Sequence, residues 1–271
     1  MSRLLRRKVR AVALTIVAPT SGFLLILALE VFLKIELSKL VSSIVNLLVV
    51  ALVAFELFPK RLGIPFGRIE TREFLKRTGF HLPHHASKHI VLGLILAACT
   101  LSGMLIASIL TGKYTMNIGT INLPHLVFCL NPALWEELFY RGVLTFLLLK
   151  FTRSLKQALV IQVISFGLTH IQGVDIGALV DSFSVIVLAI GFTYTAYKTR
   201  SLVAGVVFHY FHDAFLFFAQ LPDGIYSGVT DNAMFYGILW LMVAIACVIT
   251  KLAVERCGVR APTELYSMES V

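Results

Sequence analysis

The sequence predicts an all-α protein, a polytopic bundle of about eight membrane-spanning helices, and three observations lead to this prediction. Hydrophobic residues make up 58% of the 271 residues. Asp, Glu, Lys and Arg together make up 14%, against about 25% in a typical soluble domain. The mean hydropathy of the chain is +0.85. A soluble globule could not bury this much apolar surface and a disordered chain is far more polar, so both classes are excluded.

Eight apolar segments have about the length, near 20 residues, that a bilayer-spanning helix needs. They cover roughly residues 10–33, 39–58, 89–111, 123–149, 157–173, 176–197, 202–219 and 233–254. Each is expected to be helical, because a backbone exposed to lipid must form its hydrogen bonds within its own segment. We divide the chain into three helices at 1–122 with a basic loop at 59–88, a core of four helices at 123–219, and a last helix and tail at 220–271.

The loops between these segments differ strongly in their content of Lys and Arg. With eight spans, the side of the N-terminus carries 20 of the 24 basic residues; Arg141 lies within a span, and the other side has only Lys34, Lys39 and Lys113. Cytoplasmic loops carry an excess of basic residues, so both termini are predicted to be cytoplasmic. The net charge of +9 is therefore assigned to these loops, and nucleic acid is not expected as a partner.

Two sets of residues with metal-binding side chains are not expected to form sites. The cysteines show no metal-ligand spacing and are interpreted as free thiols: Cys99, Cys129, Cys247 and Cys257. Four histidines in or beside the basic loop are interpreted as solvated loop residues, with a metal site as the less favoured alternative: His81, His84, His85 and His89.

A group of ionisable residues lies inside the predicted spans, where each costs at least about 2.5 kcal/mol to bury. The group comprises Glu136, Glu137, Arg141, His170, His209, His212 and Asp213. At 1.5 Å per helical residue, Glu136 and His170 each lie roughly 21 Å from the nearest cytoplasmic lysine. Polar contacts between membrane helices contribute about 0.6 kcal/mol each, which explains one histidine but not seven ionisable residues at one level.

Spacing within the group predicts which side chains meet. Glu137 and Arg141 are four residues apart, so they share a helix face and can form an ion pair. Glu136 lies about 100° further round the same helix and is free to point elsewhere. His209 and Asp213 are also four residues apart. His212 is interpreted as a packing residue beside this set.

Three short motifs resemble those of a known family. E-E-L-F-Y-R at 136–141, F-G-L-T-H at 166–170 and H-Y-F-H-D at 209–213 are similar to the EExxxR, FxxxH and Hxxx(N/D) patterns of the CPBP intramembrane proteases, which include the CAAX proteases and the bacteriocin-processing Abi group. The order of the motifs and their placement on separate helices also agree. The resemblance covers about a third of the chain, near 132–213.

This resemblance implies roles for individual residues. Glu136 would be the general base that activates a water, and His170 would hold that water. Glu137 and Arg141 would orient the site. His209 and Asp213 would bind the scissile carbonyl and stabilise the oxyanion. Eukaryotic relatives have Asn at the position of Asp213, and an ionised Asp cannot donate a hydrogen bond, so this residue could instead be protonated, orient His209 or bind a metal.

Metal dependence stays open from the sequence. The family is often called a metalloprotease family, and a divalent metal such as zinc could be held by Glu136, His170, His209 and Asp213, which are suitable ligands by type. The chain lacks the H-E-x-x-H zinc signature, and we favour a glutamate mechanism that requires no cofactor.

The resemblance implies an intramembrane endopeptidase, a multi-pass protein of a prokaryotic cell membrane. Its partners would be the lipid bilayer and a membrane-associated substrate: a prenylated CAAX-like protein, a bacteriocin- or signal-peptide-like precursor, or an anchored regulator. The alternative is a catalytically silent immunity or scaffold protein that binds a peptide or a partner membrane protein. A proton-coupled transporter is a third class, but transporters usually carry inverted repeats, and the sequence shows none.

Overall fold

The computed structural model describes residues 39–62, 70–111, 115–116, 123–171, 176–220 and 229–260, with Arg6, Val9 and Ala13 as isolated positions. The regular secondary structure of this part of the chain is helical apart from one two-residue antiparallel strand pair, β1 (Thr115–Met116) with β2 (Ala219–Gln220). The all-α prediction is therefore confirmed for the described residues. The expected span at 10–33 and the C-terminal tail lie outside them.

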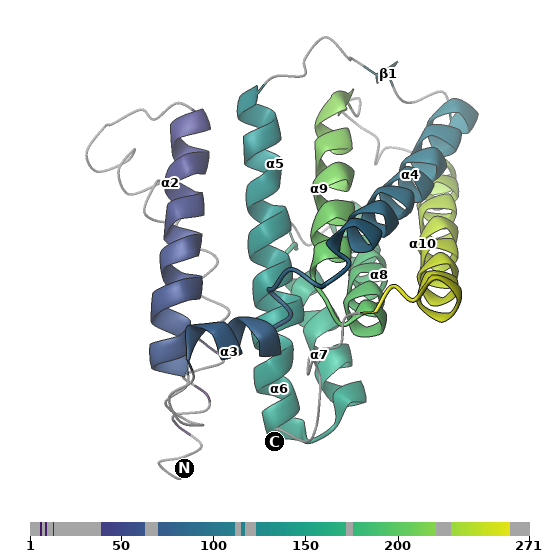
Figure 1. Cartoon of the computed structure of the whole chain (residues 1–271). Helices are drawn as coiled ribbons and strands as arrows, with labels where there is room; N and C mark the ends of the chain where they lie inside the picture. Colours follow the sequence, from purple (N-terminus) through teal and green to yellow (C-terminus); the bar gives the residue numbers. More distant parts are fainter. Residues whose placement is uncertain are drawn as a thin grey trace.

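The helices form an upright bundle with one short helix lying across it (Figure 1). Their bounds are α2 (Lys39–Leu52), η1 (Val53–Leu62), α3 (Thr71–Arg77), α4 (Ala86–Thr111), α5 (Leu123–Glu136), η3 (Glu137–Leu144), α6 (Thr145–Thr152), α7 (Leu155–Leu168), α8 (Ile176–Thr199), α9 (Val203–Phe218) and α10 (Val229–Cys257). The segments η1 and η3 are π-helical. Figure 1 shows α2, α5 and α9 side by side, with α4 running obliquely past α9 toward α10.

The central rod of the bundle is the continuous run α5–η3–α6. Its first part contains Pro132, which has no N–H to donate to the preceding turn. The π-helical turn begins at Glu137, every residue of η3 is buried, and the Thr145 hydroxyl donates to the Tyr140 carbonyl over 2.8 Å. Single π-helical turns inside α-helices are frequent at functional sites. Here the irregular turn carries the second glutamate and the arginine of the first motif.

A tight turn then reverses the chain. Arg153 adopts a left-handed conformation with φ of 52°, and Ser154 caps the next helix by accepting from the backbone N–H of Gln157. Since α6 and α7 are separated by two residues, α7 runs back along the rod. His170 thereby returns to the level of Glu136. It lies just beyond α7, which ends at Leu168, so the prediction that His170 lies deep within a helix is wrong.

Part of the expected basic loop is helical. Residues 71–77 form α3, and Phe74 is buried there and packs against Phe58, with ring centroids 6.4 Å apart. A Cβ on Gly142 would lie 2.6 Å from the Thr78 carbonyl oxygen, so this loop packs closely on η3. The interpretation of its histidines as solvated is wrong for His89, which is 1% exposed in the first turn of α4, and for His81, whose ring nitrogens are buried. The apolar Phe74 anchors the segment.

Two helices of the described part have the length and hydropathy for crossing a bilayer. They are Ala86–Ala107 in α4 and Ala233–Cys257 in α10, with mean hydropathies of 2.5 and 2.3. Only 44% and 22% of these windows are buried within the protein, and large apolar residues such as Ile109, Leu241 and Val248 are exposed. Exposed apolar surface of this extent is typical of a lipid-facing helix. The eight-span arrangement and the side of each terminus stay predictions.

Close helix contacts at small residues hold this part together. A Cβ on Gly93 in α4 would lie 2.7 Å from the Ala204 carbonyl oxygen in α9. Gly103 in α4 packs equally closely on Met242 of α10. Such contacts are common between membrane helices, because small residues let the backbones approach. They hold α9, which carries the third motif, between α4 and the central rod.

Candidate active site

Glu137 and Arg141 form a fully buried ion pair at the centre of the bundle. Nη1 of Arg141 lies 3.2 Å from Oε1 of Glu137, and both side chains are 0% exposed. The guanidinium lies over the Phe166 ring, 4.1 Å from its centroid, and 5.2 Å from the centroid of Phe192. Burying two charges is costly unless each finds its partner, so this pair fixes the position of the Glu137 carboxylate. The pairing predicted from four-residue spacing is observed.

The same carboxylate also fixes a histidine from another helix. Nδ1 of His209 on α9 lies 3.0 Å from Oε1 of Glu137. An ionised carboxylate only accepts hydrogen bonds, so His209 donates from Nδ1. Its ring stacks on Phe192, with centroids 4.7 Å apart and planes 20° from parallel. With one nitrogen and one ring face held, the other nitrogen, Nε2, has a defined direction.

Nε2 of His209 points toward two further carboxylates. It lies 3.7 Å from Oε2 of Glu136 and 3.5 Å from Oδ2 of Asp213. These distances exceed that of a direct N–H···O hydrogen bond, so the groups face one another across a narrow gap. The predicted proximity of His209 and Asp213 is observed, and both lie beside Glu136.

His170 faces Glu136 from the other side. Its Nε2 lies 3.8 Å from Oε1 of Glu136, and its Nδ1 lies 2.8 Å from the Phe166 carbonyl oxygen. Since a carbonyl only accepts, Nδ1 carries the proton of this bond. Neutral His170 then has its lone pair on Nε2, aimed at Glu136.

The six ionisable motif residues fall into two groups by exposure. The closed group is Glu137, Arg141 and His209, whose side chains are 0%, 0% and 6% exposed. The open group is Glu136, His170 and Asp213, at 21%, 32% and 20%. The open group can reach water or a substrate, and in the closed group Nε2 of His209 faces the same gap. His212 is buried, 4% exposed, in keeping with a packing residue.

Four supporting residues were not predicted from the sequence in these positions. The Tyr140 and Thr169 hydroxyls lie 3.0 Å apart, and Thr169 donates to the Phe166 carbonyl over 2.8 Å, which braces the turn that carries His170. Phe192 of α8 stacks on His209. A Cβ on Gly205 would lie 3.1 Å from Oε2 of Glu137, so a small residue is needed there. No sequence pattern marks Phe192 or Gly205, because their contacts depend on how α8 and α9 pack.

Comparison with protein families identifies the part of the chain that carries this geometry. Residues 118–215 match the family model described as type II CAAX prenyl endopeptidase, Rce1-like. This segment is similar to the Rce1-like CAAX protease domain. The resemblance inferred from the three motifs is thus confirmed, and all six motif residues lie inside the match. The CAAX protease family is one of membrane-embedded proteases. Comparisons with curated proteins and with solved structures found no match.

Proposed function

We propose that the protein is an intramembrane endopeptidase that hydrolyses a peptide bond of a membrane-associated protein or peptide. The observation that carries this proposal is the convergence of two histidines on Glu136. His170, in the turn after α7, and His209, on α9, have their Nε2 atoms 3.8 and 3.7 Å from its two oxygens. A carboxylate between two imidazoles is suited to accept a proton and pass it on.

Glu136 is the general base in this proposal. Gaps of 3.5 to 3.8 Å between polar atoms are those in which a water can bridge two partners. A water between Glu136 and His170 donates one hydrogen to each, because the carboxylate and the unprotonated Nε2 of His170 are both acceptors. Glu136 takes a proton from this water while the oxygen of the water bonds to the scissile carbonyl carbon.

His209 stabilises the negative charge that forms on the carbonyl oxygen. Because Glu137 holds Nδ1 of His209, Nε2 of the same ring is aimed into the gap before the substrate binds. Preorganised donors of this kind contribute about 2.7 to 4 kcal/mol of transition-state stabilisation each. The Asp213 carboxylate lies beside this donor, 3.5 Å from Nε2. The C–N bond then breaks, and the proton held by Glu136 passes to the leaving amine.

No step of this proposal passes through a metal. His209 donates from Nδ1 to Glu137 and His170 donates from Nδ1 to a backbone carbonyl, and each leaves one nitrogen directed at Glu136. Zinc held by Glu136, His170, His209 and Asp213 is the alternative that the test below addresses.

We further propose that the protein crosses a prokaryotic cell membrane about eight times with both termini in the cytoplasm. The strong asymmetry of basic residues between its loops supports this orientation. Candidate substrates are prenylated CAAX-like proteins, bacteriocin- or signal-peptide-like precursors and anchored regulators.

The test compares peptide termini in host membranes that contain either wild-type protein or Glu136→Gln at equal abundance. We expect a defined set of termini to disappear in the variant, because Gln keeps the shape of the side chain but cannot accept a proton. Chelation of divalent metals should leave wild-type cleavage intact; loss on chelation and recovery with zinc would favour the metal alternative. Identical termini in wild type and variant would contradict proteolysis and favour the immunity or scaffold role.

A further inference from the structure

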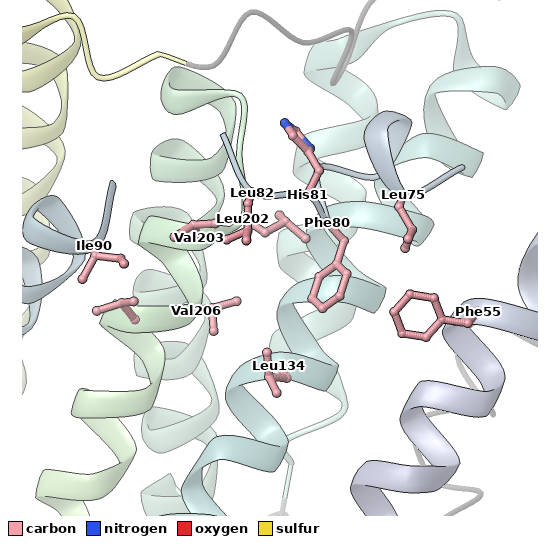
Figure 2. A pocket seen from close by; sticks show the side chains of 12 residues that line it. Phe55, Leu75, Phe80, His81, Leu82, Ile90, Leu134, Leu202, Val203 and Val206 are labelled. Atoms are coloured by element: carbon pink, nitrogen blue, oxygen red, sulfur yellow. The ribbon is translucent and has the colours of Figure 1, made fainter. Parts of the chain in front are cut away.

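A second site lies on the other side of the α5–α9 pair. It is a cavity of about 380 Å³ between α3 and its following loop, α4, α5 and α9. Figure 2 shows Leu75, Phe80, Ile90, Leu134 and Val206 lining it. Among the described residues around it, one polar side chain, that of His81, takes part in the lining. The interior is therefore suited to a hydrocarbon group and not to a peptide backbone, which needs hydrogen-bonding partners.

This cavity is distinct from the candidate active site. Leu134 precedes Glu136 by two residues, which places the two side chains about 200° apart around α5. Between the two sites, Gly205 of α9 packs directly against the Glu137 carboxylate. Of the described residues that line the cavity, none is acidic. A group bound there leaves the open group around Glu136 accessible.

The cavity has a polar end at the basic loop. Figure 2 shows the His81 ring at its rim, turned away from the apolar side chains of Phe80 and Leu202. Both ring nitrogens of His81 are buried without a hydrogen-bond partner in the described part of the chain. Burial, and then the nearby charge of Lys76, lower the pKa of His81. Neutral His81 thus offers one N–H beside the exposed ammonium of Lys76, a pair suited to an anion.

The position of α3 fits a lipid–water interface. This helix lies across the upright helices in Figure 1, with Phe74 buried beneath it and Lys76 exposed. Helices of this kind lie in the interfacial plane with the apolar face inward and the basic face toward anionic lipid heads. Below it the cavity is open at its side, where Ile90 is 41% exposed and Leu82 is 80% exposed.

We propose that this cavity binds one hydrocarbon chain of an anionic membrane phospholipid, with its phosphate at His81 and Lys76. The apolar lining fits one hydrocarbon chain, the lateral opening leaves the second chain in the bilayer, and the basic polar end fits the phosphate. The occupant fills the space between α4, α5 and α9 and so supports the helices that carry Glu136 and His209. The proposal concerns lipid binding alone and does not depend on proteolysis.

The first test measures lipid retained by the full-length protein, reconstituted into vesicles of equal parts phosphatidylcholine and phosphatidylglycerol and then released for native mass spectrometry. Ile90→Trp is compared with Leu94→Trp, because both residues are on α4 and 41% exposed, but only Ile90 lines the cavity. We expect retained phosphatidylglycerol to fall about tenfold in Ile90→Trp, the effect of excluding about two methylene groups, and not in Leu94→Trp. Equal retention in the two variants would overturn the proposal.

The second test addresses the head group. Lys76→Gln should lower phosphatidylglycerol retention about fivefold, the factor expected for one basic residue near an anionic surface. Lys156→Gln, which removes another exposed charge at the start of α7, should leave retention unchanged. Retention of phosphatidylcholine in preference to phosphatidylglycerol by wild type would also contradict an anionic occupant.

A third measurement needs no variant and so is independent of folding defects. Phosphatidylglycerol with a photoactivatable group at the end of one chain is crosslinked to wild-type protein in vesicles, and the adducts are mapped. We expect adducts on cavity residues such as Leu134 and Val206, and none on Leu94. Displacement of these adducts by a lipid-modified peptide at equal concentration would instead assign the cavity to the substrate and overturn the phospholipid proposal.

Discussion

The two glutamates of the first motif are adjacent in sequence and lie in opposite surroundings. Glu137 is 0% exposed, paired with Arg141 and bonded to His209, whereas Glu136 is 21% exposed and faces His170 and His209 across gaps of 3.7 to 3.8 Å. Buried charges with short contacts hold a structure in place, because moving them leaves an uncompensated charge. Partly open groups separated by gaps can exchange protons with water. The contrast indicates that Glu137 and Arg141 hold the site in place, whereas Glu136 and the groups that face it take part in the reaction.

The largest effect on stability is expected from breaking the closed ion pair. Arg141→Met leaves the Glu137 charge buried and removes the contact with Phe166, so the free energy of unfolding should fall by about 3 to 5 kcal/mol. The matched control is Arg77→Met, which breaks the partly exposed pair of Arg77 with Glu73, also four residues apart, and should cost about 0.5 kcal/mol or less. Thermal unfolding in detergent measures both, and equal effects would contradict the distinction.

A large effect on cleavage with little effect on stability is expected in the open group. His170→Gln removes the acceptor that faces Glu136, so cleavage should fall about 100-fold. The free energy of unfolding should change by about 0.5 kcal/mol or less, because His170 is 32% exposed beyond the end of α7. His84→Gln in the exposed loop is the control. Unchanged cleavage, or unfolding of the variant, would remove His170 from the reacting group.

A smaller effect tests the bracing of the His170 turn. Tyr140→Phe removes the hydroxyl partner of Thr169 and should cost about 1 kcal/mol of stability. Cleavage should fall about fivefold, because the turn that orients His170 is less tightly held. Tyr194→Phe on α8 removes a hydroxyl elsewhere and serves as the control. Cleavage equal to wild type at reduced stability would show that the hydroxyl pair supports the fold alone.

The smallest effect is expected at Asp213. Asp213→Asn keeps the size of the side chain and a polar group 3.5 Å from Nε2 of His209, while Nδ1 of His209 stays bonded to Glu137. Cleavage should therefore change less than about fivefold, the effect of about one hydrogen bond. A loss as large as that in Glu136→Gln would instead make Asp213 the base.

The helices and the meeting of the motifs could be predicted from sequence because they rest on local rules. Apolar run length gives most helix positions, such as α8 at 176–199 against the expected 176–197. The four-residue spacing gives the pair of Glu137 with Arg141. Similar depth in separate helices predicts that His170 and His209 approach Glu136.

The remainder depends on contacts between segments distant in sequence. Glu137 reaches His209 because Gly205 allows α9 to approach the rod closely, and no local pattern encodes that approach. Thr169 and His170 leave the helix because the chain turns at the end of α7. The cavity beside Leu134 forms only where α3 and α4 meet the rod.

The most direct measurement compares Glu136→Gln with Glu137→Gln, two identical changes at neighbouring positions, by peptide termini in host membranes and by thermal unfolding of the purified proteins. We expect Glu136→Gln to lower cleavage by about 10² to 10⁴ with unfolding like that of wild type. We expect Glu137→Gln to lower the free energy of unfolding by about 3 kcal/mol or more, because the Arg141 charge is left buried without its partner. Equal loss of stability in both variants, or full cleavage by Glu136→Gln, would contradict the division between a closed supporting group and an open reacting group.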